Sequence, residues 1–249
     1  MLSERLVNTV ARKKIVFVIV EGASDDEALG ILLEKAFDRS SVYVHITHGD
    51  ITSMPGTDPT QIITKVAEIV KTYAKSTHLT HSHFQEILHI VDTDGVFVPD
   101  DSIVEDPCVE KTIYSLTEIR TNNAHGIQLR NERKRLCLSR LYGAQRIWGI
   151  PYQVFYMSCN LDHVLHNKQN STDEEKESDA FSFAKRYRDD LGGFIHFISE
   201  SEFSVMSGYI ESWNYIKQEL HSLERHSNLG HRLKALYDSR SENDSLPND

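Results

Sequence analysis

Two apolar segments of the sequence end in carboxylates whose types and spacing suit the binding of a divalent cation. The first segment, KIVFVIVEG, leads into Glu21, and Asp25 follows four residues later. The second segment, EILHIVDTDG, ends in Asp92 and Asp94. A charge at the rim of a core is costly unless it has a partner, and converging carboxylates repel one another. Mg²⁺ and Mn²⁺ prefer oxygen ligands, so the pattern predicts a metal site built from these four acids.

The elements that must position these acids follow the pattern of an alternating α/β chain. Residues 15–20 and the segment EILHIVDTDG are expected to be buried strands, because short β-branched runs next to glycine suit a parallel sheet. A further strand, SVYVHITHGD, lies between them and is closed by Gly49. Apolar stripes at helical spacing, residues 28–37 and 62–73, separate the strands. We therefore expect an α/β fold, a mainly parallel sheet flanked by helices, with the acids in one crevice at its carboxyl edge.

The middle of the chain alternates less regularly. The segment VFVPDDSIVEDPC is expected to be a loop, residues 113–119 a short strand and residues 130–145 a helix. IPYQVFYMSC predicts a fourth core strand, and a short helix is expected at 161–166. Together with the first three strands, these elements define an expected catalytic core at residues 1–165.

The C-terminal part, residues 166–238, is expected to be a helical region. An acidic break is predicted at 170–178, a helix around 179–190, and a long amphipathic helix over 203–223. The tail YDSRSENDSLPND is poor in apolar side chains, and residues 239–249 are expected to be disordered.

The two acidic segments together resemble the TOPRIM domain, which topoisomerases, primases, recombination factors and OLD-type nucleases share. The pattern of that domain is an apolar strand ending in EG, an acid a few residues later, and a later apolar strand ending in DxD. Here these are VFVIVEG with Asp25, and LHIVDTDG, while THGD fits the second strand of OLD-like members. The resemblance covers residues 13–100 and implies a TOPRIM-like fold that holds Mg²⁺ or Mn²⁺ at the acids.

A later segment, YQVFYMSCNLDHVLH, is similar to the OLD-type element in which a strand leads into a helix that begins with an acid. By that resemblance Asp162 is a further metal ligand, although Asp stands where Glu is commoner. An acid in the first turn of a helix also has a structural explanation, because it interacts favourably with the helix dipole.

Among the members of the family, the chain most resembles a stand-alone nuclease. The chain has no cysteine cluster for the zinc domains of primases and RecR-like factors, is far shorter than a topoisomerase and carries no GxxxxGK[ST] motif. Stand-alone TOPRIM nucleases beside a separately encoded ATPase occur in bacterial antiphage systems, which suggests a defence role here. The partners considered are DNA or RNA as substrate, a separate ATPase and a second copy of the chain.

The chemistry implied by the resemblance is that of an Mg²⁺- or Mn²⁺-dependent endonuclease acting on phosphodiester bonds. Asp25, Asp92 and Asp94 would hold one or two ions over the phosphate. Glu21 either completes the metal shell or relays a proton, and the sequence leaves both roles open. The expected catalytic residues are Glu21, Asp92 and Asp94.

A basic segment, RNERKRLCLSR, could contact the phosphates of a nucleic acid. It supplies Arg130, Arg133, Lys134 and Arg140 within one predicted helix. Arg133 and Arg140 are seven residues apart and therefore share a face. The alternative interpretation is a charged helix face that is simply exposed to solvent.

Composition restricts the other classes of function. A hydrophobic content of 39% and a charged content of 26% are ordinary for a globular chain of 249 residues. The net charge of −10 argues against general coating of nucleic acid. There is no apolar run of the roughly 20 residues that a membrane span needs, and no secretory signal core. The three cysteines are widely separated, which favours reduced thiols and a cytoplasmic location.

Two other interpretations stay open besides the nuclease. A non-catalytic TOPRIM-fold module could use the acids to bind a nucleotide or nucleic acid through Mg²⁺ for regulation. A phosphoryl-transfer enzyme acting on a small molecule could also use a DxD pair. The EG motif on the earlier strand argues against the small-molecule enzyme. The joint presence of all four acids argues against a pure scaffold.

Overall fold

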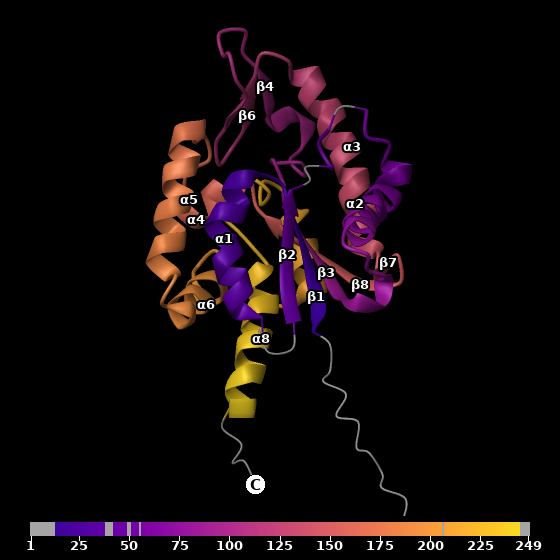
Figure 1. Ribbon diagram of the computed structural model, residues 1–249. Helices are drawn as coiled ribbons and strands as arrows, with labels where there is room; N and C mark the ends of the chain where they lie inside the picture. The colour runs from indigo at the N-terminus through magenta and orange to yellow at the C-terminus, as the bar shows by residue number, and fades with distance from the viewer. Residues whose placement is uncertain (1–12, 38–41, 49–50, 55, 206, 245–249) are drawn as a thin grey trace, which may run out of the picture.

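The computed structural model describes residues 13–244 apart from 38–41, 49–50, 55 and 206, and its centre is a five-stranded sheet. The strand order is β2-β1-β3-β8-β7. The fifth strand, β7 (Arg146–Ile147), is antiparallel to its neighbour. The other four run parallel: β1 (Lys14–Val20), β2 (Val42–His48), β3 (Phe84–Asp92) and β8 (Ile150–Met157). The expected α/β fold with a mainly parallel sheet is confirmed (Figure 1).

The register of the parallel strands brings their carboxyl ends to one edge of the sheet. Ile19 of β1 lies opposite His89 of β3, and Asp92 at the end of β3 lies opposite Met157 at the end of β8. β1 is a central strand whose residues 16–20 are at most 1% exposed. A continuous apolar run of this kind is what a strand covered on both faces requires.

Helices cover both faces of the sheet (Figure 1). Side chains alternate along β1, so that Val16 and Val18 point to one face and Phe17 and Ile19 to the other. The valine face is covered by α1 (Ala23–Ala36), α4 (Leu161–His166), α5 (Asp173–Tyr187), α6 (Leu191–Glu200) and α8 (Leu229–Asp244). The other face is covered by α2 (Ile62–Ser76), α3 (Ala124–Gly143) and α7 (Tyr209–Ile216). None of the described helices is long and apolar enough to cross a membrane.

A small second sheet stands above the carboxyl ends of the main strands (Figure 1). It contains β4 (Ile103–Glu105), β6 (Ile119–Thr121) and β5 (Ile113–Tyr114), in that order. Its own apolar cluster joins Ile103 and Ile119 to Leu223 from the C-terminal part. The described part of the chain also contains short 3₁₀ helices: η1 (Pro59–Gln61), η2 (His81–His83) and η3 (Asp100–Ser102).

Three expectations from the sequence need correction. The segment VFVPDDSIVEDPC is not a loop throughout, because it contains η3 and the strand β4. Residues 113–119 form two strands rather than one, because a turn intervenes in which Ser115 N donates to Glu118 O. The acidic break at 170–178 is instead the start of α5, which begins at Asp173. Thr172 and Glu175 form a capping box there, and acids in the first turn favour the positive end of the helix dipole.

The C-terminal helices also differ from the expectation. The apolar residues of 203–223 do not form one helix, because Gly208 has a φ of 132° and α7 covers only eight residues. The helix expected around 179–190 ends at Tyr187, and α6 follows it. Residues 239–244 are helical rather than disordered because they continue α8, whose first turns are anchored by buried Leu229 and Leu233. Residues 245–249 of the expected tail, and Gly49 of the second strand, lie outside the described residues.

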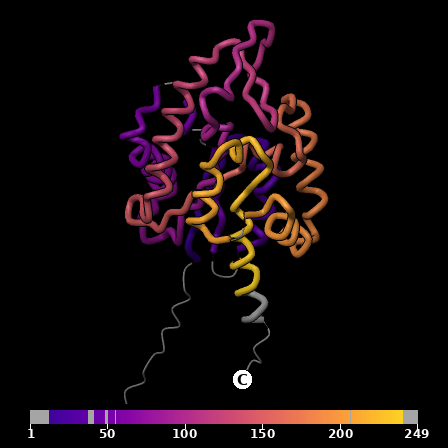
Figure 2. Tube along the Cα trace, turned by 180° about the vertical axis from the view of Figure 1, so that it is seen from behind, coloured from indigo at the N-terminus to yellow at the C-terminus, as the bar shows by residue number. Residues whose placement is uncertain are grey.

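The C-terminal helices share the apolar cluster of the sheet rather than forming a cluster of their own. Phe194 of α6 and Leu233 of α8 pack in the same cluster as Val16 and Leu29. Seen from behind, the C-terminal segment in yellow runs over the middle of the molecule between the α3 and α5 sides (Figure 2). The expected boundary at residue 165 therefore does not separate the two parts in their packing.

Replacing Leu233 with Ala tests this shared core. Leu233 is fully buried, so the change should lower the free energy of unfolding by about 2–5 kcal/mol. Urea unfolding would be followed by tryptophan fluorescence, because both tryptophans, Trp148 and Trp213, pack in the cluster on the opposite face of the sheet. Ser239→Ala, an exposed position on the same helix, is the control and should change little. If Leu233→Ala leaves the midpoint of the tryptophan transition unchanged, α8 unfolds separately from the rest of the core.

Candidate metal centre

The DxD turn at the end of β3 is held by the end of β8. Thr93, between the two acids, is fully buried, and its N–H donates to Met157 O at 2.9 Å. Asp94 N donates to Cys159 O at 2.7 Å, and Cys159 N donates back to Thr93 Oγ1 at 2.8 Å. Asp94 has a φ of 49°, a left-handed conformation that Asp tolerates better than most residues. The turn thus fixes the backbone of both acids beside the end of β1, where Glu21 follows Val20.

Glu21 and Asp94 converge on one ammonium group, that of Lys134 from α3. Lys134 Nζ lies 2.5 Å from Asp94 Oδ2 and 3.5 Å from Glu21 Oε1, and its side chain has no solvent exposure. Burial by itself would lower the pKa of Lys134, but Asp94 and Glu21 outweigh it and raise that pKa, so the lysine is charged. Burial would likewise raise the pKa of Asp94, but Lys134 and Arg130 hold it below its usual value. These three residues form a buried ion-pair network.

Asp92, unlike Glu21 and Asp94, is not paired with the ammonium group of Lys134. Burial raises its pKa well above the usual value for an aspartate, and the charges of Glu21, Asp25 and Asp94 raise it further. Lys134 opposes this shift only in part. Asp92 makes no ion pair with any of the residues that the structure describes. A carboxylate in this position is stabilised by a nearby cation or by protonation.

Asp25 and Asp162 form the other side of the acidic cluster. Asp25 Oδ2 accepts from Gly22 N at 2.9 Å, a capping-box contact at the start of α1. Burial raises the pKa of Asp25, and the charge of Asp162 adds to the rise. Burial also raises the pKa of Asp162, whose Oδ2 lies 3.9 Å from Lys176 Nζ on α5. The structure therefore brings Asp162, expected from the resemblance alone, within electrostatic range of Asp25.

Two hydroxyl groups were not anticipated from the sequence. Thr52 Oγ1 lies 3.5 Å from Glu21 Oε1, and Ser53 Oγ lies 3.3 Å from Asp94 Oδ2. Both residues follow β2, whose carboxyl end neighbours that of β1 in the parallel sheet. The position of THGD at the end of that strand is the signal that could have located them.

The basic residues of α3 separate into two groups. Lys134 is buried in the ion-pair network and is not an exposed phosphate contact, contrary to expectation. Arg130 also points inward, donating to Asp94 O and to Tyr114 Oη, each at 2.8 Å. Arg133 is half-buried and Arg140 is exposed. Of the four expected contacts, Arg140 and, to a lesser extent, Arg133 are accessible to a large ligand.

The donor set suits a hard divalent cation. The acids and the two hydroxyls offer only oxygen, which Mg²⁺ and Mn²⁺ prefer. Burial and the neighbouring acids raise the pKa of Asp92, so a cation beside it would favour its ionised form. Among the described residues, however, no three His, Cys, Asp or Glu side chains are gathered closely enough to form the shell of an ion. Lys134 explains part of this spacing, because two of the acids are turned toward its ammonium group.

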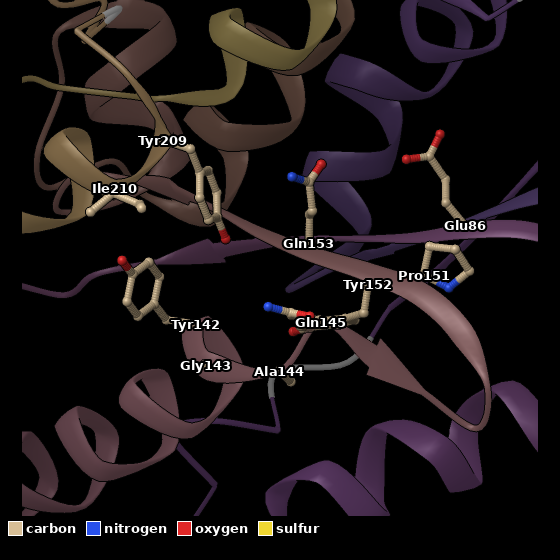
Figure 3. A pocket seen from close by; sticks show the side chains of 10 residues that line it. All are labelled: Glu86, Tyr142, Gly143, Ala144, Gln145, Pro151, Tyr152, Gln153, Tyr209 and Ile210. Atoms are coloured by element: carbon tan, nitrogen blue, oxygen red, sulfur yellow. The ribbon is translucent and has the colours of Figure 1, made fainter.

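A pocket of about 560 Å³ lies near the opposite, amino-terminal ends of the strands (Figure 3). Its lining includes Tyr142, Tyr209 and Gln153, and Glu86 is the one acid among the residues that line it. Glu86 is already paired with Arg232, Oε1 to Nη2, at 2.6 Å. The pocket does not contain the converging acids, so the candidate centre lies at the carboxyl edge.

The raised pKa of Asp92 predicts how Asp92→Asn changes stability with pH in the absence of metal. A carboxyl whose folded pKa lies above 3.8, its ordinary value, stabilises the fold when protonated, and this contribution is lost as pH rises through the folded pKa. In EDTA, Asp92→Asn should therefore be more stable than the wild type at about pH 8, and its advantage should shrink towards about pH 5.

The measurement is the difference in melting temperature between the two proteins across that range. Burial lowers the pKa of His89 to about 3 and that of His163 to about 4, and any contribution of these histidines is common to both proteins and cancels in the difference. A variant that is less stable at every pH would instead assign Asp92 a structural role.

Comparisons with protein-family models, with curated proteins and with solved structures found no match for this chain. Its function is therefore inferred from the motifs and from the geometry at the carboxyl edge of the sheet.

Proposed function

We propose that the chain is an Mg²⁺- or Mn²⁺-dependent nuclease with a TOPRIM-like fold. The observation that carries the proposal is that Glu21, Asp92 and Asp94 follow or end two adjacent parallel strands, with Glu21 and Asp94 both in contact with the ammonium group of Lys134. Ligand sites in open α/β sheets lie outside the carboxyl ends of the strands. The resemblance to TOPRIM supports the same site, because its EG and DxD motifs are the two strand ends that meet here.

The chain's own residues have distinct tasks in this proposal. Asp25, Asp92 and Asp162 present oxygens to the cation, and Asp94 is fixed by Lys134 and Ser53. When bound, the cation lowers the pKa of water and neutralises charge on the phosphodiester. Glu21 either joins the ligands or accepts the proton of the attacking water, and its contact with Thr52 is compatible with both roles. Arg133 and Arg140 contact the phosphate backbone along α3.

The resemblance to stand-alone TOPRIM nucleases also suggests a partner and a biological role for the proposed nuclease. A separately encoded ATPase would be the partner, in antiphage defence, and the chain itself contributes the cleavage site. Neither DNA nor RNA is favoured by the described contacts, so both belong in the first assay.

A second candidate is a non-catalytic TOPRIM-fold module that binds nucleotide or nucleic acid. One observation favours it: Lys134 already neutralises part of the charge of Glu21 and Asp94, and Asp25 already caps α1. These contacts give three of the acids structural roles. The two candidates differ in whether the protein cleaves nucleic acid. Only the nuclease predicts cleavage, and it predicts that cleavage requires Asp92.

The deciding assay incubates the protein with plasmid, single-stranded DNA and tRNA, each with Mg²⁺, Mn²⁺ or EDTA. Cleavage should require the metal. Even residues that support metal ligands typically cost 10–100-fold when replaced, so Asp92→Asn should lower the rate by about 100-fold or more. Asp238→Asn, an exposed acid on α8, is the matched control. Full activity of a folded Asp92→Asn protein would refute the nuclease, and metal-dependent binding without cleavage would favour the module.

The exposed arginines of α3 predict the salt dependence of binding. Replacing Arg140 with Ala should weaken binding about equally for different sequences and reduce the slope of log affinity against log salt by about 1, because one phosphate contact is lost. Arg133→Ala should have a smaller effect of the same kind, since its side chain is half-buried. Lys71→Ala, exposed on α2, is the control. An unchanged slope for Arg140→Ala would mean that this face of α3 is only solvated.

A further inference from the structure

Lys134 occupies a position on α3 that would otherwise hold an apolar side chain. The buried residues of this helix include Cys137, Leu138 and Leu141, which pack on the sheet, and Lys134 lies one turn before them on the same side. Lysine is almost never fully buried unless it is paired, because desolvating its charge is costly. An uncharged side chain of similar length would fill the space equally well. The position therefore requires the charge itself.

The charge is placed where a metal ion would bridge two of the strand ends. Lys134 Nζ contacts one oxygen of Glu21, after β1, and one oxygen of Asp94, after β3. Asp94 Oδ2 also accepts from Ser53. These oxygens are thus engaged by the protein's own donors, whereas Asp92 has no ion pair among the described residues.

We propose that Lys134 is a built-in cation that replaces one divalent ion between Glu21 and Asp94, so that the centre binds a single divalent ion on the side of Asp92. This inference depends on the proposed metal centre but not on cleavage. The positive charge of Lys134 both repels a second ion and keeps Glu21 and Asp94 together when no metal is bound. Lys134 is a positioning residue in this scheme, not a phosphate contact.

A second contact fixes the helix that carries this lysine. Arg130, one turn earlier on α3, donates to the backbone carbonyl of Asp94. α3 therefore contacts Asp94 of the DxD turn twice: Arg130 donates to its backbone carbonyl, and Lys134 pairs with its side chain. Replacing the ammonium alone leaves the Arg130 contact in place, so the variant Lys134→Met removes the charge with little change in the position of the turn.

The test counts Mn²⁺ ions bound per chain by electron paramagnetic resonance and by calorimetry, at neutral pH and without nucleic acid. The wild type should bind one ion. Lys134→Met should bind a second ion or bind the first at least about tenfold more tightly, equivalent to one decade in Kd. Lys234→Met, which breaks a surface pair with Glu200, is the matched control and should match the wild type. A wild-type count other than one, or unchanged binding in a folded Lys134→Met protein, would overturn the inference.

A melting-temperature measurement covers the case in which Lys134→Met folds poorly. In EDTA this variant should melt below the wild type, because Glu21 and Asp94 lose their counter-charge. Mn²⁺ should raise its melting temperature more than that of the wild type, since a ligand of the native state stabilises by mass action. An equal rise in both proteins would contradict the proposal. The two hypotheses can fail separately. If the wild type binds one ion but does not cleave nucleic acid, the proposed role of Lys134 is retained and the nuclease function is refuted. If it cleaves nucleic acid but binds two ions, the nuclease function is retained and the proposed role of Lys134 is refuted.

Discussion

Electrostatic repulsion within a desolvated group of carboxylates is the constraint on which the described centre depends. Asp92 lies at the end of a central strand with Glu21, Asp25 and Asp94 close enough to raise its pKa. The core cannot relieve this repulsion by moving the acids apart, because β1 and β3 are hydrogen-bonded neighbours in fixed register. The remaining means of compensation are a cation from the chain and a cation from solution. Lys134 provides the first, and the position of Asp92 leaves a place for the second.

Because Lys134 lies on α3, the charge balance of the acids depends on how α3, the small sheet and the C-terminal part are packed. α3 follows the small sheet of β4, β6 and β5, and Arg130 joins that sheet to the DxD turn by contacting both Tyr114 Oη and Asp94 O. Ser222 O accepts from Thr93 Oγ1 at 3.1 Å, which ties the C-terminal part to the same turn. The turn is therefore supported from β8, α3 and the segment after α7. This support explains how Asp94 can be held in a left-handed conformation beside like charges.

The acids were predictable from the sequence because their position depends on local pattern. An apolar run that ends in EG or in DxD marks a strand end, and parallel strand ends meet at one edge of a sheet. Lys134 was expected to contact phosphate but is buried, and the sequence could not show this for an equally physical reason. Arg130, Arg133, Lys134 and Arg140 surround α3, so charge alone does not reveal which one faces inward. The inward direction is set by the acids themselves, which are distant in sequence.

In the C-terminal part, too, some helix boundaries are set by nearby residues and others by contacts with residues distant in sequence. The start of α5 was recoverable from Thr172 and Glu175, since a capping box is a local signal that outweighs the polar composition of the segment. The apolar residues of 203–223 have helical spacing, yet they pack in three different clusters, with Phe203, Trp213 and Leu223 in one each. One straight helix could not reach all three. The break at Gly208 follows from this division of the core, and it frees the segment after α7 to reach Thr93 and support the acidic turn.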